Sequence, residues 1–175
     1  MKDNRIKWMG GLLIIGLLIS SQSIISVNGQ NLPGNTNWSG YVHIHENVVV
    51  PSGVTLTVEP GAVILMDCID GNEIEITVQS GGTLVANDAT FAGDGYPSSG
   101  CWDAIEFEAG SNGTIRNSEV RDTQNGIIVG SDVEIRGNVI QHVYGEDGTD
   151  EQTSGGSAWG ILVDVFNPSL FCITW

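Results

Sequence analysis

Basic residues are scarce in this chain, and lysine is absent from most of it. Six Lys and Arg residues stand against 21 Asp and Glu residues. Three of the six lie in the first seven positions (Lys2, Arg5 and Lys7), and no lysine follows Gln30. Nucleic acids and anionic membrane surfaces are bound through clustered Lys and Arg. The composition therefore excludes both as partners of the region after Gln30 and leaves a membrane contact only to the N-terminal segment. The missing lysine also excludes Schiff-base chemistry there.

Helical periodicity is also missing. No long segment carries apolar residues at the i, i+3, i+4 spacing of an amphipathic helix. Short runs rich in Val, Ile and Thr occur instead, separated by Gly, Asn, Asp and Ser. Such runs predict an all-β domain of short strands and tight turns.

Several of these runs are near-copies of one another. Ile115–Val120 aligns with Ile135–Ile140, 20 residues later. Ala104–Phe107 recurs as Gly126–Val129 after 22 residues and as Gly160–Val163 after a further 34. Short strands repeated at a nearly fixed period pair with their equivalents in the next turn of the chain. The repeats predict a coil of parallel strands around an aliphatic column. An antiparallel sandwich is the alternative, but it does not require copies at a fixed period.

Alternation within the strands predicts which side chains point into the coil. They are apolar and occupy matching places in successive copies. One class of strand contributes Ile105, Phe107, Ile127, Val129, Ile161 and Val163, a second Ile115 and Ile135, and a third Val120 and Ile140.

The first 29 residues are predicted to form a signal-peptide helix. A basic start is followed by the apolar run Trp8–Ile19 and then by polar residues. This run is short for a membrane span of ~20 residues. We expect cleavage between Ser26 and Gln30, and the alternative is an uncleaved anchor that extends to Val27. Either way the chain is expected to be secreted or on the cell surface.

Export would make N-glycosylation and disulfide formation possible. Asn37 and Asn112 begin Asn-x-Ser/Thr tripeptides and are candidate glycosylation sites. Three cysteines, Cys68, Cys101 and Cys172, allow one disulfide in an oxidising compartment. We favour the pair Cys68 and Cys101, because both lie at loop edges, and buried free thiols are the alternative.

Five segments together resemble a known family: Trp38–Gly61, Trp102–Ile105, Trp159–Ile161, Gly126–Val129 and Val133–Ile140. The first is similar to the entry turn of right-handed parallel β-helix proteins, the pectin-lyase-like family. The Trp segments are similar to strand openings of later turns, and the last two to a generic turn of that family.

The resemblance covers about residues 37–165. It implies a right-handed parallel β-helix of a few turns over residues 30–165, followed by a non-repeating tail at 166–175. A β-helix that ends without a polar cap exposes its apolar column and a strand edge. The tail is therefore interpreted as a makeshift cap, a self-association surface or the end of a truncated reading frame.

The family implies a fold more sharply than an activity. Its members include polysaccharide lyases and hydrolases, adhesins, surface-layer proteins and copper-associated periplasmic proteins. Members that are enzymes use the outward face of one strand class, where this chain is expected to place Asp103, Glu106, Glu108 and Asp164. Paired carboxylates there suit acid–base catalysis, or Ca²⁺ binding for a uronate substrate. No complete polygalacturonase-like motif set is present, and the alternative interpretation is a solvated acidic face.

An acidic insert interrupts the repeat at residues 145–151. It must project as a loop, and its carboxylates suit Ca²⁺. Its candidate ligands are Asp147, Asp150 and Glu151, and a simply hydrated loop is the alternative.

His43 and His45 are two residues apart on an expected strand, so their rings face one side. They could share copper or zinc, although the sequence shows no third ligand, and a surface pair is the alternative.

Arg116 and Arg136 lie one repeat apart. One could act as a lyase base, or both could pair with acids such as Glu134.

Aromatic side chains are candidate stacking platforms for sugar rings: Trp38, Tyr41, Tyr96, Trp102 and Trp159. Trp102 and Trp159 occupy matching places at strand openings, which favours packing against turns instead.

Taken together, these features favour an exported, non-enzymatic β-helix module that binds polysaccharide or a cell-envelope component, or that serves adhesion or structural display. The alternatives are a Ca²⁺-dependent polysaccharide lyase or glycosidase and a periplasmic copper-associated protein.

Overall fold

A computed structural model of the chain describes residues 24–68, 74–95, 101–144 and 161–163. All regular structure in these ranges is β-strand, and all strand pairs there are parallel. The parallel all-β prediction is confirmed, and the antiparallel alternative is wrong for this part of the chain. Among the described residues there is no helix with the length and apolar character of a membrane span. The expected signal helix up to residue 23, the acidic insert and the C-terminal tail lie outside the described residues.

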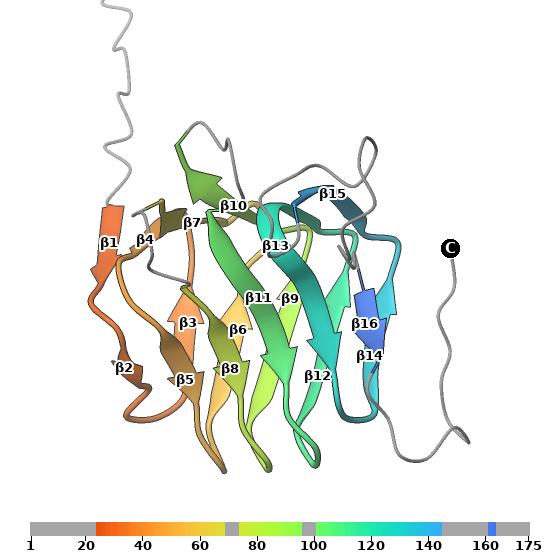
Figure 1. Ribbon diagram of the computed structural model, residues 1–175. Helices are drawn as coiled ribbons and strands as arrows, with labels where there is room; N and C mark the ends of the chain where they lie inside the picture. Colours follow the sequence, from red (N-terminus) through yellow and green to blue (C-terminus); the bar gives the residue numbers. More distant parts are fainter. Residues whose placement is uncertain (1–23, 69–73, 96–100, 145–160, 164–175) are drawn as a thin grey trace, which may run out of the picture.

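The strands fall into three rows (Figure 1). The first row consists of β1 (Ile24–Val27), β4 (Tyr41–Ile44), β7 (Val63–Asp67), β10 (Thr90–Asp94), the first half of β13 (Glu119–Val129) and β15 (Val139–Val143). The second row consists of β2 (Gln30–Asn31), β5 (Val48–Val50), β8 (Ile76–Val78), β11 (Trp102–Phe107), the second half of β13 and β16 (Ile161–Val163). The third row consists of β3 (Thr36–Trp38), β6 (Thr55–Val58), β9 (Thr83–Asn87), β12 (Asn112–Arg116) and β14 (Val133–Arg136).

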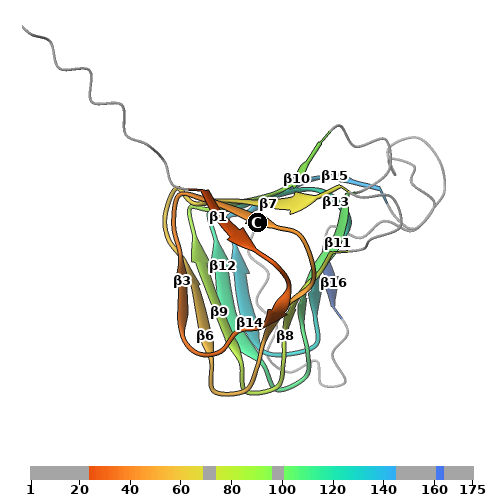
Figure 2. The ribbon, with the colours of Figure 1, turned by 90° about the vertical axis from the view of Figure 1, so that its left-hand side faces the viewer.

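Each strand up to β10 pairs with the strand three places further along the chain. The long strand β13 belongs to two rows, since its residues 119–123 pair with β10 and β15 and its residues 126–129 pair with β11 and β16. The first two rows therefore form one curled 11-stranded sheet, and the third row forms a separate five-stranded sheet. In Figure 2 the three rows lie on three sides of a common interior. This arrangement is compatible with a solenoid.

The interior is filled by side chains in register. Val42, Ile64, Phe91 and Val120 align across four strands of the first row, and each is fully buried. The inward assignments from the sequence are confirmed for residues that are at most 6% exposed: Ile105, Phe107, Ile115, Val120, Ile127, Val129 and Ile135. Ile140 and Ile161 pack against this core while partly buried.

The strand β1 lies within the segment expected to be a signal peptide. Ile24–Val27 pairs with Tyr41–Ile44 and continues the first row. Its outward side chains are exposed, including Ile24 at 71%, and Val27 packs against the core. A mature chain that begins at Gln30 would lack this strand and leave the edge of β4 unpaired.

One column of glycines permits the tight turns between the second and third rows. Gly53, Gly81 and Gly110 have φ angles of +78°, +79° and +82°, a region that favours glycine. The N–H of Gly53 donates to the carbonyl of Gly81, and that of Gly81 donates to the carbonyl of Gly110, both at 2.9 Å. A Cβ atom at Gly110 would lie 2.6 Å from the Oγ atom of Ser80. Backbone conformation and close stacking therefore both require glycine here.

We predict that Gly110→Ala lowers the free energy of unfolding by about 1–3 kcal/mol, because a side chain is strained at this φ angle and its Cβ atom meets Ser80. The measurement is urea denaturation of the full chain. The matched control is Gly34→Ala, since Gly34 has no positive φ angle and no atom within 4 Å of an added Cβ. Equal losses in the two variants would contradict the stacked-turn account.

Candidate functional site

Two histidines and two aspartates meet on the outward side of the first row. His43 lies on β4, and His45 follows the end of that strand. Asp67 ends β7 and Asp94 ends β10, and these two aspartates are opposite each other in the parallel register. We call His43, His45, Asp67 and Asp94 the histidine–aspartate cluster. The sequence showed no third ligand for the histidines, and the structure brings two carboxylates to them.

The distances within this cluster are short. The Nε2 atom of His43 lies 2.6 Å from Oδ1 of Asp67 and 3.0 Å from Oδ2 of Asp94. The Nδ1 atom of His45 lies 2.7 Å from Oδ2 of Asp67, and the two imidazole ring centres are 4.5 Å apart. The Asp67 side chain is 18% exposed, whereas that of Asp94 is 50% exposed. The cluster is therefore sheltered at Asp67 and open to solvent at Asp94.

The two rings differ in their hydrogen bonding. Both nitrogens of His45 have partners: Nδ1 bonds to Asp67 at 2.7 Å and Nε2 to the hydroxyl of Ser26 at 2.8 Å. The Nε2 atom of His43 is buried and makes no hydrogen bond, although two carboxylate oxygens lie within 3.0 Å of it. Two carboxylates thus converge on one ring nitrogen of His43.

A disulfide links the end of β7, the strand that carries Asp67, to the residue before β11 and passes close to β10. It joins Cys68, the residue after Asp67, to Cys101, the residue before β11. The sulfur atoms pass close to Gly93, where an added Cβ would lie 2.5 Å from Cβ of Cys101. Closing a loop with a sequence separation of 33 residues stabilises the fold, by about 3–4 kcal/mol on the loop-entropy scale. Both aspartates are therefore anchored next to a covalent link.

A second cluster lies on the outward side of the second row. Glu75 precedes β8, and Asp103 and Glu106 lie on β11, where Glu106 is in register with Thr77. The amide of Asn125 on β13 donates to Asp103 at 2.5 Å. We call Glu75, Thr77, Asp103, Glu106 and Asn125 the second-row polar face. All five side chains are partly buried.

Glu75 is the unusual member of this face. Burial, a hydrogen bond with Glu106 and the negative charges of Glu106 and Asp103 raise the pKa of Glu75 from 4.5 to about 8. A hydrogen bond with Thr77 acts in the opposite direction. Glu75 is therefore mainly protonated at neutral pH and is hydrogen-bonded to Glu106.

The structure places the other candidate residues as follows. Glu108 lies two residues beyond Glu106, also partly buried. Asn37 is exposed and donates to Glu59 at 2.8 Å, and Asn112 is exposed on β12. Four of the predicted acids and one cysteine lie outside the described residues: Asp147, Asp150, Glu151, Asp164 and Cys172.

Arg116 and Arg136 are in register on the outward side of the third row. Arg116 forms an ion pair with Glu134, and this pair raises the pKa of Arg116 and lowers that of Glu134. The predicted pairing of an arginine with Glu134 is confirmed for Arg116. Its exposure leaves the pair a small role in stability.

The aromatic candidates divide by burial. Trp38 is 2% exposed and Trp102 is fully buried, and the indole N–H of Trp102 donates to the carbonyl of Arg121 at 3.0 Å. Neither is a platform for a sugar ring. Tyr41 is 39% exposed on the first row, and Tyr96 and Trp159 lie outside the described residues.

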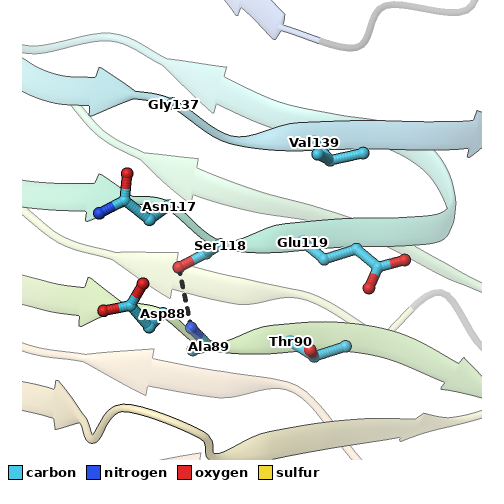
Figure 3. A pocket seen from close by; sticks show the side chains of 8 residues that line it. All are labelled: Asp88, Ala89, Thr90, Asn117, Ser118, Glu119, Gly137 and Val139. Carbon is cyan, nitrogen blue, oxygen red and sulfur yellow. Dashed lines mark hydrogen bonds between the residues drawn. The ribbon is translucent and has the colours of Figure 1, made fainter.

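A surface hollow lies where the third row turns into the first (Figure 3). Ser118 organises it: its hydroxyl accepts the N–H of Ala89 at 3.1 Å and donates to the carbonyl of Arg116 at 2.8 Å. Asp88 and Asn117 occupy equivalent corners there with positive φ angles. The polar groups of this hollow serve the turns, so it is a structural feature.

The sequence alone did not identify Asp67 and Asp94 as partners of the two histidines, or Glu75 as a partner of Glu106. Their signal was present only in the register, because the residues in contact come from strands separated by turns of different length. In the comparisons with known proteins, no family model, no curated protein and no solved structure matches the chain.

The raised pKa of Glu75 predicts a pH dependence of stability. The unfolded chain ionises Glu75 near 4.5, whereas the folded chain keeps it protonated up to about 8. The contribution of this group is thus fully present below 4.5 and is lost as the pH rises towards 8. We expect Glu106→Gln to lower the pKa of Glu75, because it removes a neighbouring negative charge. The free energy of unfolding should then fall less steeply as the pH rises.

Urea denaturation across this pH interval measures the effect. The control is Glu108→Gln, a nearby acid that does not contribute to the raised pKa. An unchanged slope in Glu106→Gln, or an equal change in both variants, would show that the coupling is absent.

Proposed function

We propose that the chain is an exported, right-handed parallel β-helix of the pectin-lyase-like type that binds polysaccharide without cleaving it. Support for the coil comes from the pairing of each strand up to β10 with the one three places later, around a shared apolar interior. The glycine column at one corner supports it further, because stacked turns of equal shape are what a coil requires.

The disulfide supports export. Such bonds persist in oxidising compartments and are rare in the cytosol of most organisms. Cys68 and Cys101 are joined across the first and second rows. With the basic and apolar leader, this pair favours a secreted or cell-surface location.

The second-row polar face is the observation that carries the binding proposal. Its side chains come from β8, β11 and β13 and the segments before them. Backbone pairing holds such strands about 4.8 Å apart, a spacing on the scale of one sugar unit. Glu75 is hydrogen-bonded to Glu106, and the amide of Asn125 donates to Asp103. The carboxylates have further lone pairs and the Asn125 amide has a second N–H, and these partly buried groups complement the hydroxyl groups of an extended sugar chain.

A polysaccharide lyase or glycosidase is the second candidate, and the pKa of Glu75 is the observation that favours it. A protonated carboxyl beside an ionised one is the arrangement used for acid–base catalysis. Glu75 and Glu106, however, share a hydrogen bond, whereas the two carboxyls of glycosidases stand about 5–9.5 Å apart with substrate or water between them. The contact therefore favours binding over cleavage.

The test is incubation of the full chain with a panel of plant, algal and bacterial polysaccharides, with and without Ca²⁺. Both depletion of protein from solution and soluble oligosaccharide products are scored. We expect depletion without products. Glu106→Gln should lower the affinity for the polysaccharide at least about tenfold, since a lost charged hydrogen bond costs about 1.5–3 kcal/mol. Glu134→Gln on the third row is the matched control and should bind like the unmodified chain.

Each other outcome has a distinct meaning. Oligosaccharide products, above all unsaturated uronates that require Ca²⁺, would replace the binding proposal by the lyase or glycosidase. Depletion that Glu106→Gln leaves unchanged would move the binding surface away from the second row. The absence of both depletion and products would contradict polysaccharide binding and would favour structural display.

A further inference from the structure

We propose that the histidine–aspartate cluster on the first row binds one divalent transition-metal ion of the zinc and copper class. The proposal is independent of polysaccharide binding, because the cluster and the second-row polar face lie on different rows of strands. It rests on donor chemistry, on the contacts of His43 and on the rigidity of the strands that hold the ligands.

The donor set matches this class of ion. His43, His45 and Asp67 each offer one ligand atom, and these atoms all lie within 4.8 Å of one another. Asp94 adds a carboxylate oxygen 3.0 Å from Nε2 of His43. Imidazole nitrogen suits zinc, copper and nickel, whereas Ca²⁺ and Mg²⁺ prefer oxygen ligands alone. Two imidazoles therefore select against the hard cations.

The contacts of His43 bring two carboxylates to one ring nitrogen, which is the arrangement a cation site needs. Its Nε2 atom is buried and makes no hydrogen bond, yet two carboxylate oxygens approach it within 3.0 Å. A hydrogen on Nε2 or a cation bound in its place would each balance the two carboxylates, and a ring with its lone pair at Nε2 needs the cation. Within the described residues, the ion pairs formed by Asp67 and Asp94 are with His43 and His45 alone. No lysine or arginine there neutralises these carboxylates, and a bound metal ion would.

The outer contacts of His45 are those of a metal ligand. Its Nδ1 atom faces Asp67, and its Nε2 atom is hydrogen-bonded to the hydroxyl of Ser26 at 2.8 Å. Histidine ligands usually use the second ring nitrogen for such a bond, which fixes the tautomer and the orientation of the ring. Ser26 on β1 would play that part here.

The ligands are held before any ion arrives. The strands β4, β7 and β10 are paired in parallel, so the ligand-bearing positions cannot slide past one another. The disulfide follows Asp67 directly, and it packs over Gly93, the residue before Asp94. This rigidity reduces the ordering cost of binding. The half-exposed Asp94 leaves the cluster a path to solvent.

Retention of zinc by the full chain is the direct test. The chain, with its disulfide intact, is stripped with a chelator, dialysed against Zn²⁺ and analysed for metal by mass spectrometry; Cu²⁺ is used in a parallel arm. We expect about one ion per chain, and a higher melting temperature with metal because the ion binds only the folded site. Excess Ca²⁺ should not displace it.

Variants locate the ion. His43→Asn and His45→Asn should each weaken retention by at least about tenfold, and Ser26→Ala should weaken it by about tenfold, since outer contacts contribute 10–100-fold in metal sites. The matched control is His142→Asn. His142 is also close to an aspartate, at 3.2 Å from Asp122, but lies outside the cluster. Asparagine tolerates its φ angle of +53°, so this variant should retain metal like the unmodified chain.

The possible results divide clearly. If either histidine variant fails to fold without metal, Asp94→Asn replaces it, because Asp94 is half-exposed at the end of its strand. No retention of Zn²⁺ or Cu²⁺ by the unmodified chain would overturn the proposal. Retention that is equal in the cluster variants and in His142→Asn would also overturn it and place the ion elsewhere.

Discussion

Parallel register between successive turns is the constraint on which the rest of this molecule depends. Ile76, Ile105 and Ile127 stand directly opposite one another on three neighbouring strands, and all three are fully buried. Because side chains alternate across a strand, this column also determines that Thr77, Glu106 and Ile128 form the outward column beside it. The outward chemistry is thus a consequence of how the apolar residues stack.

The same constraint assembles functional clusters from distant residues. His43 and Asp94 lie in contact although more than two turns of chain separate them. Asp67 reaches both histidines from the strand between, and the disulfide fixes that strand end to the residue before β11. Each row therefore presents its own chemistry: imidazole and carboxylate on the first, and a protonated carboxyl hydrogen-bonded to a second carboxyl on the second.

The inward residues could be predicted, because aligning the near-copies of the repeat identifies equivalent apolar positions. Ile115 and Ile135 were identified as equivalent from their 20-residue spacing, and the structure pairs them directly. The contacts of the clusters were not predictable, because turns of unequal length break the period. Asp67 and Asp94 are in register at a separation of 27 residues, and Thr77 and Glu106 at one of 29. No repeat of 20–22 residues aligns these positions, and the raised pKa of Glu75 arises only once its neighbours are in place.

The stacking of buried residues in register is tested most directly by two substitutions on one strand. Ile127 is fully buried, and its neighbour Ile128 points outward and is partly exposed. Thermal melting of Ile127→Asn and Ile128→Asn in the full chain compares the same chemical change on opposite faces. The account predicts loss of the cooperative transition, or a fall of more than about 3 kcal/mol, for Ile127→Asn, and a change within about 1 kcal/mol for Ile128→Asn. Similar melting of the two variants, or the reverse order, would contradict it.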